Sequence, residues 1–105
     1  SQVASINVSL LAVNATALIE FRVHQNYPNP TNLKTTIKFS VNKSEHATVI
    51  VYDIVCKQVA RLFDGVVQPG HYYGVDFDCS SLSSGIYFYM VTTASHSELK
   101  KLVLI

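Results

Sequence analysis

Strict alternation of apolar and polar residues is the feature that most constrains how this chain folds. In the run Thr35–Val41, apolar side chains at positions 37, 39 and 41 alternate with polar side chains between them. Successive side chains of a β-strand point to opposite faces of the sheet, so this pattern gives a strand with one dry face and one wet face. No stretch of a dozen residues carries a comparable stripe at helical spacing. The pattern predicts an all-β protein.

Turn signals divide the chain from Leu18 onward into short β-type runs, at the spacing of about 8–12 residues that is typical of sandwiches and small barrels. We expect strands over residues 18–25, 35–41, 47–54, 57–63, 71–78, 86–93 and 98–105, with Asp64-Gly65 ending the fourth. Seven short strands with short connections favour an immunoglobulin-like Greek-key β-sandwich, with an up-and-down barrel as the alternative. Tyr87 occupies the position at which such sandwiches often use a corner tyrosine.

Length and composition restrict the class of protein further. The 105 residues suit one domain, which we place at residues 20–105, with residues 1–19 as a linker or the end of a preceding domain. Hydrophobic residues make up 49% of the chain and charged residues 14%, which argues against disorder. A net charge of +1 gives no electrostatic footprint for nucleic acid. No apolar stretch reaches the roughly 20 residues of a membrane span, so we do not expect a transmembrane protein.

Residues that carry chemistry are scattered. The four histidines fall in different runs or turns and have no zinc-finger spacing: His24, His46, His71 and His96. Asp76 and Asp78 share a strand face, which suits a solvent-facing carboxylate and a turn cap better than a cation site. Cys56 and Cys79 allow one disulfide bridge or none. We therefore predict no catalytic residues, metal site or cofactor, and no enzyme.

Aromatic residues offer a better case for binding. Tyr72 and Tyr73 are adjacent and point to opposite faces, which leaves room for one exposed ring. The run 86–93 is apolar on both faces, so it is either a strand covered on both sides or part of an exposed patch that includes Phe88. Tyr72, Tyr73 and Phe88 are the candidate binding aromatics.

An ordered set of short segments resembles a known family. The segments are Gln25-Asn26-Tyr27-Pro28-Asn29-Pro30, Thr35-Thr36-Ile37-Lys38-Phe39-Ser40, Val51-Tyr52-Asp53-Ile54, Leu82-Ser83-Ser84-Gly85-Ile86-Tyr87-Phe88-Tyr89 and Lys100-Lys101-Leu102-Val103-Leu104-Ile105. In this order and at this spacing, they resemble the type A C-terminal sorting domain of type IX (Por) secretion substrates of Bacteroidetes. The resemblance covers about residues 21–105.

This resemblance implies a function without catalysis. Such a domain ends a larger secreted protein, and the outer-membrane translocon recognises it after Sec export. A sortase-like transpeptidase then removes it, here by a cut within residues 1–19, and leaves the N-terminal cargo domain secreted or at the cell surface. The alternatives are an immunoglobulin-like accessory module, which packs on a catalytic domain or contacts carbohydrate, and a structural module like that of flagellar hook-capping proteins.

Carried over by position, the family signature falls on Pro28, Asn29, Pro30, Gly85, Tyr87 and Lys101. Two interpretations of these residues stand side by side: contact points for recognition, and turns that determine the fold. The chain departs from the family pattern at Val55-Cys56, where Leu-Gly is usual, so we expect a longer or strained hairpin there.

Overall fold

The chain folds into two antiparallel sheets. The computed structural model describes residues 20–105, so the predicted linker at residues 1–19 lies outside the described residues. The described part contains seven strands and no helix. The strands are β1 (Arg22–Val23), β2 (Lys34–Ser40), β3 (Glu45–Tyr52), β4 (Gln58–Val67), β5 (Tyr73–Asp78), β6 (Gly85–Thr93) and β7 (Ser97–Leu104).

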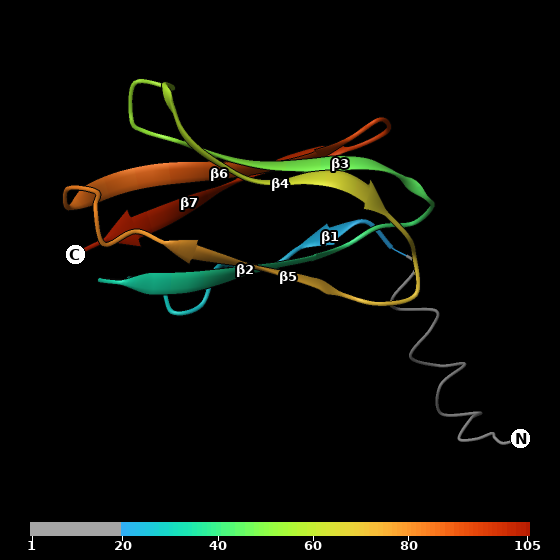
Figure 1. Cartoon of the computed structure of the whole chain (residues 1–105), viewed down its shortest axis with the longest axis horizontal. Helices are drawn as coiled ribbons and strands as arrows, with labels where there is room; N and C mark the ends of the chain where they lie inside the picture. The colour runs from blue at the N-terminus through green and yellow to red at the C-terminus, as the bar shows by residue number, and fades with distance from the viewer. Residues whose placement is uncertain (1–19) are drawn as a thin grey trace, which may run out of the picture.

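One sheet has the strand order β1-β2-β5 and the other has the order β4-β3-β6-β7. The two sheets face each other as the layers of a sandwich (Figure 1). Every neighbouring pair of strands is antiparallel. The predicted all-β, seven-stranded, immunoglobulin-like sandwich is therefore confirmed, whereas the alternative of a single closed barrel is wrong.

The core lies between the inner faces of the two sheets, and the period-two pattern of the sequence becomes its burial pattern. In β2, Ile37 and Phe39 are fully buried while Lys38 between them is exposed. Val49 of β3 and Tyr89 of β6 are fully buried from the opposite sheet. Each large apolar side chain removed from water contributes roughly 1.5–3 kcal/mol to folding, so this layer is the main source of stability.

Most strand boundaries lie within two residues of the sequence prediction, but β1 and β4 differ from it by more. β1 has only two residues, although the His24 N–H still donates to the Lys38 carbonyl of β2 at 2.9 Å and Tyr27 forms an isolated bridge to Thr36. β4 runs through Asp64-Gly65 instead of ending there, and Gly65 pairs with Ala47 of β3. The Asp64 carboxylate does not form a turn, since it bonds to His46 and Arg61 on the exposed surface of the same sheet.

The hairpin between β3 and β4 depends on one carboxylate. Asp53 Oδ1 accepts hydrogen bonds from the backbone N–H groups of Val55 and Lys57, at 3.0 and 2.9 Å. Cys56 has a φ of 65°, a left-handed conformation that is uncommon outside glycine and asparagine. The strain expected at Val55-Cys56 therefore falls on Cys56.

Both cysteines are free. Of the two possibilities that the sequence left open, one disulfide bridge or none, the structure has none. Cys56 is exposed, whereas Cys79 is buried and its Sγ donates to the Leu33 carbonyl at 3.1 Å. Residues 20–105 contain no helix that is long and apolar enough to cross a membrane. In the same part of the chain, His, Cys, Asp and Glu side chains form no group of three that suits a metal ion.

Candidate functional site

The connection between β1 and β2 contains the proline pair of the family signature, and we call its residues Asn26–Thr31 the corner. The peptide bonds that precede Pro28 and Pro30 are both cis. At the start of the corner, Tyr27 and Thr36 exchange two backbone hydrogen bonds of 3.0 Å. Pro28, Asn29 and Pro30 are all exposed. The corner thus presents its signature residues to solvent while its start is fastened to β2.

The far side of the corner is bonded to the last strand. Asn29 Oδ1 accepts a hydrogen bond of 3.0 Å from the N–H of Val103, which lies 74 residues further along the chain. Thr31 N–H donates to the Val103 carbonyl at 2.9 Å, and Ile105 N–H donates to the Thr31 carbonyl at 2.8 Å. We call the exposed corner residues together with Lys101, Val103 and Ile105 the corner–strand surface.

A buried polar side chain supports the corner from within. Asn26 is only 2% exposed, and its Nδ2 donates to the Pro28 carbonyl at 3.0 Å and to Thr35 Oγ1 at 2.9 Å. Thr35 Oγ1 in turn donates to the Pro28 carbonyl at 2.9 Å. Buried polar groups are costly unless they are hydrogen-bonded, and here they bond one another. The network therefore fixes the backbone of the corner at Pro28.

The hydroxyl of Tyr89 joins the corner to β6. It accepts a hydrogen bond from the Asn26 N–H at 2.8 Å and donates one to the His24 carbonyl at 2.7 Å. Burial raises the pKa of Tyr89 to about 12, so the hydroxyl keeps the proton that it donates. Burial, followed by the charges of Lys38 and other nearby cations, lowers the pKa of the neighbouring His24 imidazole.

Two more signature residues lie at the start of β6, beside the last strand. Gly85 pairs with Leu104 of β7 and has a φ of +152°. No atom lies within 4 Å of the place where a Cβ would stand, so conformation and not space requires glycine here. Tyr87 is buried, and its hydroxyl donates to the Ser83 carbonyl at 2.7 Å, which is the expected corner-tyrosine bond.

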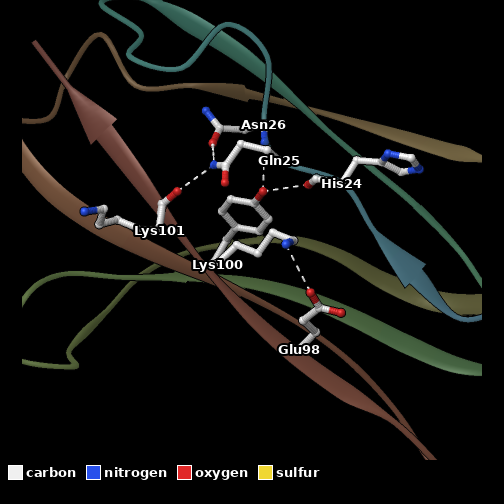
Figure 2. A network of polar contacts seen from close by, with 7 residues as sticks. His24, Gln25, Asn26, Glu98, Lys100 and Lys101 are labelled. Atoms are coloured by element: carbon white, nitrogen blue, oxygen red, sulfur yellow. Dashed lines mark hydrogen bonds and ion pairs between the residues drawn. The ribbon is translucent and has the colours of Figure 1, made fainter.

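Lys101 is exposed on β7 and pairs in register with Phe88 of β6. Its carbonyl accepts a 2.7 Å hydrogen bond from Gln25 Nε2, just before the corner (Figure 2). The structure therefore brings the corner prolines, Asn29 and Lys101 to one region of the surface, with Gly85 next to the end of β7. Tyr87 is the exception, since its hydroxyl faces its own loop from a buried position.

The three candidate binding aromatics do not come together. Tyr73 packs inside, with its ring centroid 5.5 Å from that of Phe39, and its hydroxyl accepts from the Gln68 N–H at 2.8 Å. Tyr72 lies beside His24 and Lys38 on the three-stranded sheet, with its ring centroid 5.2 Å from that of His24. The carbohydrate-binding alternative stays a prediction, but these residues form no common platform for it.

Phe88 lies on the outer face of the four-stranded sheet, in a shallow apolar groove. The groove has a volume of about 550 Å³ and is lined by Tyr52, Ile54, Cys56, Phe88, Met90 and Leu99. On the same strand, Ile86 is 39% exposed. The run 86–93, which is apolar on both faces, is therefore part of a partly exposed patch and not a strand covered on both sides.

Sequence reasoning missed the residues that hold the site together: Gln25, Asn26, Thr31 and Tyr89. Their partners lie far along the chain, and the Asn26–Tyr89 bond spans 63 residues. The apolar alternation of the run 86–93 places Tyr89 in the core, but no local pattern shows which backbone its hydroxyl reaches. A polar residue such as Asn26 beside a turn is ordinarily read as exposed.

The fold and the site together define a class of domain. It is an immunoglobulin-like sandwich whose corner is hydrogen-bonded to its last strand. Over residues 25–105 the chain matches the model of one family, the secretion system C-terminal sorting domain, and it belongs to that family. Among curated proteins no relative matches the chain.

Family membership sets the broad function. The domain is a type IX C-terminal sorting signal, of a kind typical of Bacteroidetes, and its family is non-catalytic. Proteins that carry it are larger precursors handled by the type IX system and secreted across the outer membrane to the cell surface or the environment.

Proposed function

We propose that the corner–strand surface is what the outer-membrane translocon recognises, and that a sortase-like transpeptidase removes the domain once the cargo reaches the surface. One observation carries the first part: Asn29 and Thr31 bond to Val103 and Ile105, so the two most separated signature segments share one surface. A partner that binds there contacts both segments at once.

Preorganisation supports this role. The corner is fixed on one side by Tyr27 and Asn26 and on the other by Val103, although Pro28 and Pro30 themselves are exposed. A surface that is already ordered loses little conformational entropy on binding, which favours affinity.

The place where the chain enters the sandwich supports removal upstream. The chain enters β1 from the end of the sandwich far from the C-terminus (Figure 1). A cut close to the start of β1 would therefore be made at the end of the sandwich far from the corner–strand surface. Binding of the domain by the translocon and its removal by a transpeptidase then need not compete for one site.

The test is an export assay in a type IX-competent host, with residues 1–105 fused behind a reporter that carries a Sec signal. The double variant Pro28→Ala/Pro30→Ala alters the exposed part of the corner. Pro69→Ala is its matched control, since Pro69 is the remaining proline and lies between β4 and β5. We expect the double variant to export about tenfold less reporter, equivalent to about 1.4 kcal/mol of binding, and the control to export normally.

Circular dichroism of each purified domain separates recognition from folding. Wild-type export by a folded double variant would overturn the proposal. If the double variant does not fold, Lys101→Glu decides, because the exposed Lys101 side chain can change while the corner stays intact. Intact mass of the surface-attached reporter tests removal, and retention of residues 20–105 would contradict it.

A further inference from the structure

The two sheets have four edge strands, and they differ in their capacity to pair with another chain. β1 has two residues, and β4 has register shifts at two places opposite β3. β5 carries Asp76 and Asp78, so self-pairing about Phe77 would bring like charges together. β7 pairs with β6 over eight residues without a shift, which leaves a long, regular outer edge.

Half of the β7 edge is already covered. Gln25 and the corner bond to the Lys101 carbonyl and to both backbone groups of Val103. Alternate residues of a strand direct their backbone groups to the same edge, so the N–H and C=O of Leu99 point outward as well. Within residues 20–105 no group bonds to them. Ser97–Lys101 is therefore an open edge of five residues centred on Leu99, on which only the Lys101 carbonyl already has a partner, Gln25.

The charges on the open edge are self-complementary. Glu98 and Lys100 project to the same side of β7, where their side chains form a 3.1 Å ion pair and remain 40% and 27% exposed (Figure 2). If a second copy pairs antiparallel about Leu99, Glu98 of each copy faces Lys100 of the other. Opposite charges directly across an antiparallel pair are favourable, and here the symmetry produces two such pairs.

We propose that two copies of this chain associate through the open edges of β7, antiparallel and two-fold symmetric about Leu99. The two Leu99 residues exchange N–H···O=C hydrogen bonds, and Ser97 lies opposite Lys101 of the second copy. The result is a continuous sheet of eight strands. This inference goes beyond the proposed sorting function and does not depend on it.

The ends of the open edge fix the register. β7 begins at Ser97, and the residues before it turn back toward β6, away from the edge. At the other end, Gln25 bonds to the Lys101 carbonyl and the corner covers the strand from Val103 onward. A second copy can therefore pair along five residues and no further. Leu99 also lines the apolar groove with Phe88 and Met90, so pairing brings two apolar grooves into one sheet face.

The test is sedimentation equilibrium of the whole chain with two charge variants. Glu98→Lys makes residues 98 and 100 both positive, and Lys100→Glu makes both negative. In either homodimer the two symmetric pairs become repulsive, so we expect the dimer Kd to rise by about tenfold or more. Mixing the two variants restores every pair with opposite charges, and a heterodimer should form with a Kd near that of the wild type.

If the substitutions weakened the dimer by destabilising the fold of each chain, mixing would not restore association, because each chain would still be destabilised. Recovery on mixing therefore shows that the charge pairs are responsible. A wild-type chain that stays monomeric up to about 1 mM would overturn the proposal. So would a dimer that both charge variants leave unchanged, or two variants that fail to pair when mixed.

A second pair of variants tests the backbone bonds. Leu99→Pro removes the outward N–H without removing a bond to β6, and should abolish the dimer; Leu99→Val keeps the N–H and should retain it. A dimer in the folded proline variant would place the interface elsewhere. Export of the same variants is measured separately in the reporter assay. Sedimentation therefore tests the dimer and export tests the sorting surface, and either proposal can fail without the other.

Discussion

The corner and the β3–β4 hairpin connect strands of the same sandwich, but they are held in opposite ways. The corner depends on a buried asparagine and on a bond to Val103, 74 residues away. The hairpin depends on the carboxylate of Asp53 within the same turn, and its Val55 side chain is 75% exposed. The corner is therefore held by residues far along the chain, and the hairpin by a residue of its own turn.

Removing the hydroxyl of Tyr89 should give the largest effect among the tests of this comparison. Tyr89→Phe leaves the Asn26 N–H and the His24 carbonyl without partners, and should lower the free energy of unfolding by about 3 kcal/mol. Tyr87→Phe is the matched control, since it removes one bond to the Ser83 carbonyl and should cost about 1 kcal/mol. Urea unfolding measures both. Equal losses would show that the corner network is no more important than a local bond.

Alkaline pH tests the same hydroxyl without a core substitution. The pKa of Tyr89 is about 12 in the folded chain and about 10 when unfolded, so the unfolded chain loses this proton first as pH rises. Below pH 10 the protonated Tyr89 hydroxyl makes its full contribution to the stability of the folded chain. The free energy of unfolding should then fall by about 1.4 kcal/mol per pH unit between about pH 10 and 12. Unfolding titrations of wild type and Tyr89→Phe over this range isolate the effect, because all other tyrosines are common to both. Parallel pH profiles would contradict it.

Gly85 extends the comparison to the connection beside the last strand. Its φ of +152° is a conformation that other residues rarely adopt, so Gly85→Ala should destabilise the fold by about 2 kcal/mol. Gly74→Ala is the control, because that glycine has no left-handed φ and a Cβ there would meet Thr36 at an ordinary 3.7 Å. The control should be neutral or slightly stabilising in thermal unfolding. A neutral Gly85→Ala would remove the conformational argument.

The smallest effect should come from the hairpin, and with the opposite sign. Cys56→Gly relieves the left-handed conformation at φ 65° and should raise the free energy of unfolding by about 0.5–1 kcal/mol. Cys56→Ser, which keeps a Cβ, should give no such gain. Denaturant midpoints measured under reducing conditions decide between them. A loss of stability in the glycine variant would show that the hairpin is not strained.

Much of the fold was predictable from the sequence, because local alternation determines which face of a strand is buried. Thr35–Val41 was expected as a strand, and β2 is found at Lys34–Ser40. The errors occurred where a side chain overrides a turn signal. Asp64-Gly65 looks like a stop, yet the bonds of Asp64 to Arg61 and His46 belong to a strand that continues to Val67.

The candidate site was predictable only in its exposed parts. Resemblance to the family placed the signature on the corner and on Lys101, but the residues that join them were not identified. Asn26 and Tyr89 are joined across 63 residues, and no periodicity carries information over that separation. Such pairings follow from the packing of two sheets and not from any single segment.

The bonds between the corner and β7 also make the state of one segment depend on the other. Asn29 bonds to Val103, and Thr31 bonds to both Val103 and Ile105. A molecule cleaved by a protease within β7 would keep its proline pair but leave it unanchored. If the translocon reads this surface, such cleaved molecules are rejected at the membrane without a separate proofreading factor.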